Sequence, residues 1–302
     1  MFFTLRQKWL GTVYSMIYVL YCVYSVYHFI KEKYVLAPVY TEVISTENIE
    51  NVEKKFLKND TGVVVFHPRE GESYRKCMLV FNSCYGNANL KYLLVRQMQN
   101  TFSTFTIIQV EYPGFGFSHH FDPTITDILS LTFESYKLIL EEYRMIETIG
   151  FFGEQFGSYV QSVVYEKAFQ KNLRLPDFMI QLNGIDNLYD FAMEENHLFM
   201  SVLQLPLLAW KSSSEYYKNL KNNIQIFILF TNDHVSVEDS FSLYYQIYQP
   251  KRKVFLMELS GSKNFGFLVR ENSRLIDNIY QAISKEEVNE SSFARIVSNS
   301  PP

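Results

Sequence analysis

Seven short apolar segments alternate with amphipathic segments along most of the chain. The apolar segments are rich in Val, Ile and Phe, which is typical of strands buried on both faces of a sheet. They cover residues 62–67, 78–82, 105–111, 148–152, 178–182, 224–230 and 254–259. The segments with a helical period cover residues 88–99, 126–143, 158–170, 237–248 and 273–284. This alternation predicts a mostly parallel, doubly wound α/β sheet with helices on both of its faces.

The N-terminal region contains a long uncharged run, residues 10–30. A helix of this length spans about 31 Å, which matches a hydrocarbon core of about 30 Å. Lys8 precedes the run and Lys31 follows it, so charge leaves the orientation open. The run is longer than the apolar core of a signal peptide and lacks a small-residue cleavage site. We therefore predict a single-pass membrane anchor, with a buried core helix as the alternative.

The uncharged run holds five tyrosines, and the spacing of Tyr14, Tyr18 and Tyr21 places these three on one helical face. Hydroxyl groups at membrane depth find partners on neighbouring helices. We therefore expect two kinds of partner for the anchor: the lipid bilayer, and other membrane-protein subunits that contact this tyrosine face.

Composition argues against nucleic-acid-binding proteins and against proteins that a disulfide framework or a zinc ion stabilises. A net charge of −4 and a pI near 5.9 argue against a nucleic-acid-binding protein. Three cysteines are too few for a disulfide framework or a zinc site, and we predict no metal and no cofactor. The first 31 residues contain no Asp or Glu, which fits the mitochondrial inner membrane or an ER-type endomembrane. Sequons at Asn59 and Asn289 would matter only in a lumenal protein.

The predicted elements divide the chain into three parts. Residues 1–33 form the anchor, residues 34–284 form the α/β domain, and residues 285–302 form a polar tail. Residues 186–223 are a longer, aromatic insert between two predicted strands, and we interpret them as a helical cap over the domain.

Several motifs follow predicted strands, where sites form in a parallel sheet. Gly-Glu-Gln-Phe-Gly at residues 153–157 lies between a strand and a helix, the context of a nucleophile elbow. Residues 111–118 form an aromatic turn with two glycines, and residues 82–88 and 230–235 follow two other strands. We expect these four segments to meet at one edge of the sheet.

In this order, over residues 60 to 284, the segments resemble the α/β-hydrolase superfamily, near its serine-aminopeptidase-like, membrane-anchored branch. The turn at residues 182–186 is similar to that branch as well. The resemblance implies an α/β-hydrolase fold with a helical cap, preceded by one transmembrane helix. It also implies a catalytic triad: a nucleophile at residue 155, an acid at Asp233, and a histidine in the loop after the last strand.

The sequence departs from this family pattern at the triad. Gln155 occupies the nucleophile position, and a primary amide is a very poor nucleophile. Lys263 occupies the expected histidine position, and the last histidine of the chain is His234. Asp233 is retained. In the oxyanion loop, Asn82 and Ser83, followed by Cys84, replace the usual His-Gly. We interpret all of these as vestigial positions and predict no catalytic residues.

These departures predict that the chain is not an enzyme but a pseudoenzyme, an inactive structural or interaction subunit of a larger membrane complex. Two alternatives remain open. The first is a binding protein that keeps a pocket for a lipid or small apolar ligand under the cap. The second is an active serine-type hydrolase, an esterase or thioesterase, with displaced catalytic residues. Ser158, Cys84 and the pair His119–His120 are the other groups close to the motifs.

Overall fold

The computed structural model describes residues 2–33, 36, 51–68, 75–84, 88–118, 122–195, 205–231, 237–259 and 273–284. Several residues named above lie outside these ranges: His119, His120, Asp233, His234, Lys263, Asn289 and the tail from residue 285.

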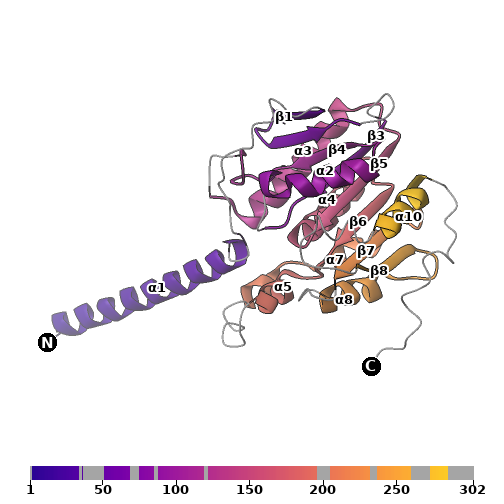
Figure 1. Ribbon diagram of the computed structural model, residues 1–302. Coiled ribbons are helices and arrows are strands. Elements are labelled where there is room, and N and C mark those ends of the chain that lie inside the picture. Colours follow the sequence, from indigo (N-terminus) through magenta and orange to yellow (C-terminus); the bar gives the residue numbers. More distant parts are fainter. Residues whose placement is uncertain are drawn as a thin grey trace.

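The described chain forms one sheet of eight strands (Figure 1). The strands are β1 (Val52–Phe56), β2 (Gly62–Phe66), β3 (Lys76–Phe81), β4 (Thr106–Val110), β5 (Thr148–Glu154), β6 (Phe178–Leu182), β7 (Gln225–Thr231) and β8 (Lys253–Leu259). Their order is β1-β2-β4-β3-β5-β6-β7-β8. β2 runs antiparallel to β1 and β4, and all other neighbours are parallel. We call the edge where β3 to β8 end the carboxyl edge.

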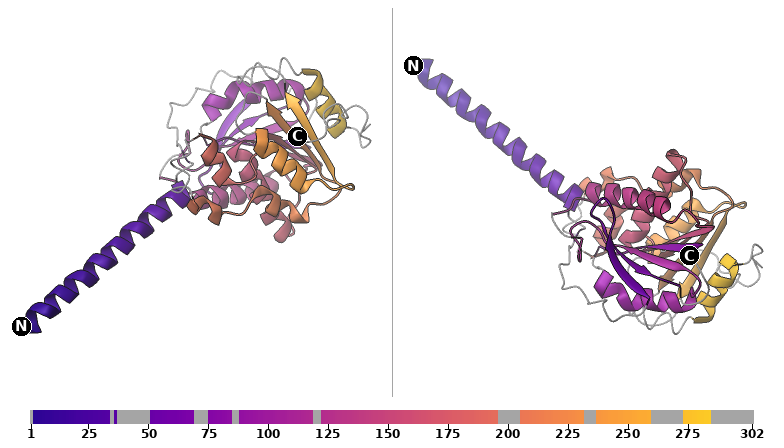
Figure 2. Two further views of the ribbon diagram at one scale, coloured as in Figure 1. Left: turned by 90° about the horizontal axis from the view of Figure 1, so that it is seen from below. Right: turned by 90° about the horizontal axis from the view of Figure 1, so that it is seen from above.

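Helices cover both faces of the sheet, which confirms the predicted fold class (Figure 2). Two hydrophobic clusters form the core, one on each face. One face carries α3 (Ile125–Glu142), α4 (Phe156–Gln170) and α8 (Val237–Ile247). The other carries α2 (Ala88–Thr101) and α10 (Ser273–Ser284). The central strands are buried along their whole length, as their apolar sequences predict.

The sequence pattern missed the first strand, β1. Its sequence, Val-Glu-Lys-Lys-Phe, is too charged to indicate a buried strand. β1 lies at the edge of the sheet, where charged side chains reach solvent and discourage pairing with other chains. Lys55 instead turns toward the end of α3, where its ammonium group pairs with Glu142 and donates to the Tyr143 hydroxyl over 3.0 Å.

The segment between β6 and β7 forms a cap of short helices: α5 (Leu188–Glu195), η2 (Leu205–Ala209), α7 (Ser213–Tyr216) and η3 (Tyr217–Asn219). Buried Asp186 fixes this cap to the domain. Its carboxylate accepts hydrogen bonds from Ser214 N at 2.9 Å and from Gln246 Nε2 at 2.9 Å. The bonds join α7 to α8, so the cap has a defined position.

Helix α1 (Phe2–Lys33) projects from the domain as a rod (Figure 2). Its segment Thr12–Lys33 is long and apolar enough to cross a membrane, and most of it makes no contact with the rest of the protein. This is the helix that the uncharged run predicts.

Candidate functional site

The residues of the predicted elbow, 153–157, form a sharp turn between β5 and α4. Gln155 lies at its apex with φ 47° and ψ −113°, a conformation that side-chain-bearing residues rarely adopt. Its backbone N donates to Leu182 O at 2.9 Å, which ties the apex to the end of β6. The sequence correctly located a strand–turn–helix element here, and the structure adds the backbone conformation.

The two glycines of the elbow allow the chain to approach itself closely. A Cβ atom on Gly157 would lie 2.1 Å from Phe81 O, and one on Gly153 would lie 2.6 Å from Gly157 O. Both contacts are with backbone, which cannot move aside like a side chain. The glycines therefore let α4 start directly against the end of β3.

Ser158, one of the hydroxyls near the elbow, is held in backbone contacts. Its Oγ donates to Gln155 O at 2.6 Å and accepts from Ile185 N at 3.1 Å, and the residue is fully buried. These two bonds link the elbow to the loop after β6. Ser158 therefore stabilises the turn and is not placed to attack a substrate.

The loop after β3 carries the predicted oxyanion residues. Asn82, Ser83 and Cys84 are all buried. The Asn82 side chain donates to Val110 O at 3.3 Å and accepts from Gln109 Nε2 at 2.9 Å. Asn82 thus joins β3 to β4 beside the elbow. That these positions are vestigial remains a prediction.

The glycine-containing turn after β4 packs against the loop after β3 and against the elbow. Gly114 and Gly116 have φ values of 79° and 51°, which the turn requires. The buried Tyr112 hydroxyl donates to Asn82 O at 2.7 Å. Burial, and then the nearby Cys84, Glu154 and Glu111, raise the pKa of Tyr112, so its phenol stays protonated as a donor. The ends of β3, β4 and β5 therefore meet around this hydroxyl.

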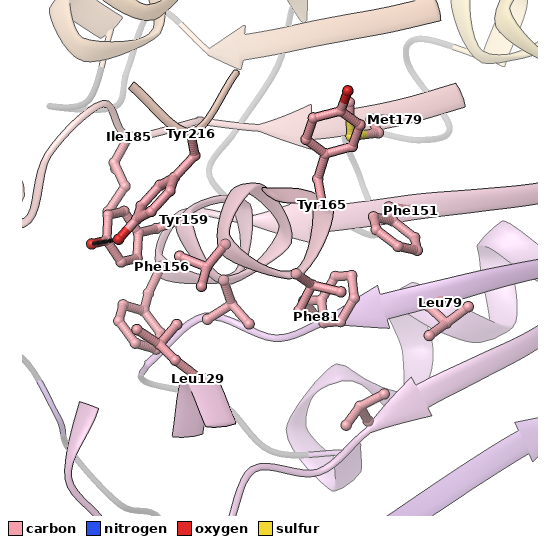
Figure 3. Close-up of a cluster of buried hydrophobic side chains, with 14 of the residues drawn as sticks. Leu79, Phe81, Leu129, Phe151, Phe156, Tyr159, Tyr165, Met179, Ile185 and Tyr216 are labelled. Carbon is pink, nitrogen blue, oxygen red and sulfur yellow. Dashed lines mark hydrogen bonds between the residues drawn. The ribbon is translucent and has the colours of Figure 1, made fainter. Parts of the chain in front are cut away.

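A wall of aromatic rings connects the elbow helix to the cap (Figure 3). Phe156 stacks on Tyr159 with ring centroids 6.3 Å apart, and Tyr159 meets Tyr216 of α7 edge to face at 5.8 Å. The Tyr159 hydroxyl donates to Lys211 O at 3.0 Å and lies 3.4 Å from the Tyr216 hydroxyl. The cap is therefore pinned one turn away from Gln155.

Of the fourth motif, residues 230–235, the structure describes only residues 230 and 231. Thr231, which ends β7, donates from its backbone N to Asn183 Oδ1 at 3.1 Å. This bond brings the end of β7 to the turn after β6, at the carboxyl edge. Asp233 and His234 follow outside the described residues, as does Lys263, and their roles remain predictions. Within the described ranges, no three His, Cys, Asp or Glu side chains gather as a metal site.

Comparison with known proteins identifies the fold. No family model matches the sequence, and no curated protein matches it significantly. Solved structures do match. An esterase from Pyrobaculum calidifontis superimposes with a TM-score of 0.60 at 13% identity, covering 82% of this chain and 87% of its own. An alpha-beta hydrolase from Vibrio vulnificus gives 0.61 at 13% identity, covering 78% and 82%. An esterase/lipase from an uncultured bacterium gives 0.57 at 13% identity, covering 87% and 98%. The chain therefore has the α/β-hydrolase fold.

These neighbours correct two predictions. The prediction of an inactive structural subunit and the prediction that the chain is not an enzyme are both contradicted by these structural neighbours, which are esterases and lipases. The physical reason is visible at residue 155. The sequence-based prediction took Gln155 in place of the nucleophile and Lys263 in place of the histidine for the loss of the site, whereas the backbone that presents residue 155 is fully built.

Proposed function

We propose that this protein with an α/β-hydrolase fold is a membrane-tethered hydrolase of carboxylic esters, with its reaction at the elbow. The backbone of Gln155 supports this most. Its conformation costs a non-glycine residue about 1–3 kcal/mol, and such strain persists only where the surrounding structure imposes it, most often at active sites. Gly153, Gly157 and the bond from Gln155 N to Leu182 O impose it here.

The nucleophile in this proposal is water. A primary amide loses no proton near neutral pH, so Gln155 cannot attack a substrate itself. Its amide can both donate and accept hydrogen bonds, and it can therefore orient a water molecule, as a glutamine does in GTP hydrolysis. The first N–H groups of α4, at the positive end of its dipole, would stabilise the oxyanion that forms on the ester carbonyl.

His234 is the proposed general base, because it follows the end of β7 in the sequence and imidazole is the side chain that most often transfers protons in enzymes. It takes a proton from water as the water oxygen bonds to the carbonyl carbon. The tetrahedral intermediate then loses the alkoxide, which receives that proton, and an acid and an alcohol leave. The negative charge of Asp233 would favour the transient imidazolium. We place the acyl part of the ester under the cap, where the sequence alternative puts a lipid or small apolar ligand.

Ester turnover by the full-length protein in detergent tests the function. We expect hydrolysis of p-nitrophenyl acyl esters, a loss of kcat in Gln155→Ala, and a loss of about 10²–10⁴-fold in His234→Ala. Met145→Ala is the matched control, because Met145 is exposed after the far end of α3. Absence of turnover with every ester, or full activity in Gln155→Ala, would contradict the proposal.

A second experiment separates water from a displaced nucleophile. Ser83 and Cys84 lie on the loop that abuts the elbow, and an enzyme using either would form an acyl intermediate. We expect the active protein to resist labelling by a fluorophosphonate, and its Cys22→Ala variant to resist labelling by iodoacetamide as well, because Cys22 is partly exposed and the other two cysteines are buried. Labelling that disappears in Ser83→Ala or Cys84→Ala would assign the nucleophile to that residue. The proposed function, ester hydrolysis, would then stand, but water would not be the first nucleophile.

The predictions about the anchor extend this proposal. We propose single-pass insertion of α1, membership of the serine-aminopeptidase-like, membrane-anchored branch, and contacts of the Tyr14, Tyr18 and Tyr21 face with other membrane helices. The exposure of these three tyrosines, 66–70%, supports the last point. The compartment is proposed as the mitochondrial inner membrane or an ER-type endomembrane. Separation of mitochondria from ER-type membranes tests the compartment, because only one of the two fractions should contain the protein. Protease protection in the sealed organelles of that fraction then shows on which side of the membrane the body lies.

A further inference from the structure

The last turn of α1 is docked onto the domain, unlike the rest of the helix. Ile30 and Glu32 are only 7% and 6% exposed. The Glu32 carboxylate accepts from Thr126 N at 3.2 Å and from Thr126 Oγ1 at 3.0 Å, in the first turn of α3. Negative charge at this end of α3 also complements its dipole. Lys33 pairs with Asp122 in the segment just before α3.

The cap holds the other side of the same turn. Trp210 Nε1 donates to Lys31 O at 2.8 Å, and the Lys31 ammonium group lies 5.4 Å from the centre of the Trp210 ring. Helix α1 also contacts η2, which directly precedes Trp210. Because both sides of the turn are held, the anchor and the domain keep a fixed relation to each other (Figure 2).

This docking point lies at the carboxyl edge, on the same side as the elbow. The segment that leads into α3 comes from the end of β4, and the cap comes from the end of β6. Lys211, next to Trp210, accepts the hydrogen bond of Tyr159, which stands one turn after Gln155 in α4. The membrane anchor is therefore attached beside the candidate site.

Beside the anchor, η2 presents two large apolar side chains to the outside. Leu205 is 49% exposed and Leu208 is 58% exposed, while Pro206 and Leu207 are buried. Residues three apart share a face in a 3₁₀ helix, so the two leucines point the same way. We call Leu205 and Leu208 the η2 leucine pair. Trp210 and Lys211 follow η2 in the sequence, and Trp210 contacts Lys31 of α1.

We propose that the η2 leucine pair is seated in the headgroup region of the membrane that α1 crosses. The uncharged run ends at Ile30, which places the membrane boundary at the turn held by Thr126 and Trp210. Tryptophan is enriched at this depth, and lysines beside a membrane attract anionic lipids by about 1 kcal/mol each. The cap thus adds a second, interfacial contact to the transmembrane helix.

This seat turns the carboxyl edge toward the bilayer. If the proposed function holds, the ester enters the site from the membrane, and the substrate class is an acyl lipid or another membrane-resident ester. The seat rests on the proposed membrane insertion of α1 and not on ester hydrolysis, because it follows from the docking of α1 and the exposure of the leucine pair.

Site-specific fluorescence in vesicles tests the seat on the full chain. In a Cys22→Ala background, Leu208→Cys and Met145→Cys are each labelled with an NBD maleimide, since Cys77 and Cys84 are buried. The vesicles contain phosphatidylcholine and phosphatidylserine, with a fraction carrying a nitroxide at the headgroup. We expect a blue-shifted emission and strong nitroxide quenching at position 208, and neither at position 145.

Each other outcome overturns the seat. Equally weak quenching at positions 208 and 145, without a blue shift, would show that η2 stays in water. A blue shift at position 208 without quenching would show that a protein covers η2. An activity arm then tests the substrate class separately. Leu205→Asp/Leu208→Asp should lose turnover of a vesicle-embedded ester and keep turnover of a soluble one, while Met145→Asp changes neither. If no ester is cleaved but the quenching persists, the proposed function fails and the seat stands.

Discussion

The tyrosines of the domain and those of the anchor have opposite surroundings. Five domain tyrosines are almost wholly buried as residues, and each hydroxyl has a partner: Tyr112 with Asn82 O, Tyr136 with Arg174 O, Tyr159 with Lys211 O, Tyr165 with Asn219 O and Tyr217 with Gln181 Nε2. The five tyrosines of α1 are 44–70% exposed.

The difference shows that the surroundings of a tyrosine decide whether its hydroxyl needs a partner within the chain. A buried hydroxyl is costly without a hydrogen bond, and the domain supplies a carbonyl or amide for each of these five hydroxyls. In α1, the same hydroxyls are exposed, and we propose that lipid or neighbouring membrane helices surround them. The domain's tyrosines therefore fix the cap and the elbow, and the anchor's tyrosines are available for contacts outside the chain.

The largest effect is expected from Tyr159→Ala. Removing this buried ring leaves a cavity between α4 and the cap and breaks the bond to Lys211 O. We expect the free energy of unfolding to fall by about 3–5 kcal/mol, as for other large aromatic truncations. Urea unfolding in detergent, followed by near-UV circular dichroism, measures it. Tyr18→Ala is the matched control in the anchor, and an equal loss there would break the comparison.

A smaller loss is expected from Tyr217→Phe, which keeps the ring and removes only the hydroxyl. The Gln181 side-chain amide donates to that hydroxyl at 2.8 Å, and Gln161 donates at 3.5 Å. Leaving these buried amides without the acceptor should cost about 1–3 kcal/mol. Tyr248→Phe serves as the exposed control, since Tyr248 is 48% exposed. Equal stability of the two variants would show that the buried hydrogen bond contributes nothing.

Alkaline pH should destabilise the domain through the same buried phenols. Burial raises the pKa of Tyr136, Tyr159 and Tyr217 above the ordinary value. The folded chain therefore keeps protons that the unfolded chain releases near pH 10, so stability is full below about pH 10 and falls as pH rises further. Urea midpoints between pH 8 and 11 measure this decline. It should be shallower in Tyr217→Phe, and a flat profile would contradict the assignment.

The smallest effect is expected in the anchor. Tyr14→Phe/Tyr18→Phe/Tyr21→Phe keeps the rings and removes three hydroxyls, each worth about 0.6 kcal/mol between membrane helices. The free energy of unfolding of the domain should not change. Assembly size on native gels after mild detergent extraction should decrease, and an unchanged assembly would remove the hydroxyls from any helix contact.

Much of the fold could be read from local pattern. Buried strands such as β2 and β6 have continuous apolar sequences, and the glycines at 153 and 157 marked the elbow. β1 escaped because Glu53, Lys54 and Lys55 serve an edge position that only the assembled sheet defines. The docking of Glu32 on Thr126 also had no sequence signal, since the two residues are 94 positions apart.

The sequence by itself determined the class of the fold, a helix long and apolar enough to cross a membrane, and the absence of a nucleophilic side chain at residue 155, because these depend on residue type and periodicity. Only the tertiary structure decided that Gln155 is held in a strained turn and that the anchor is docked beside it. Both depend on contacts between distant segments, such as Leu182 with Gln155 and Trp210 with Lys31. Side-chain identity alone therefore indicated a lost site, whereas the packed chain retains the backbone of one.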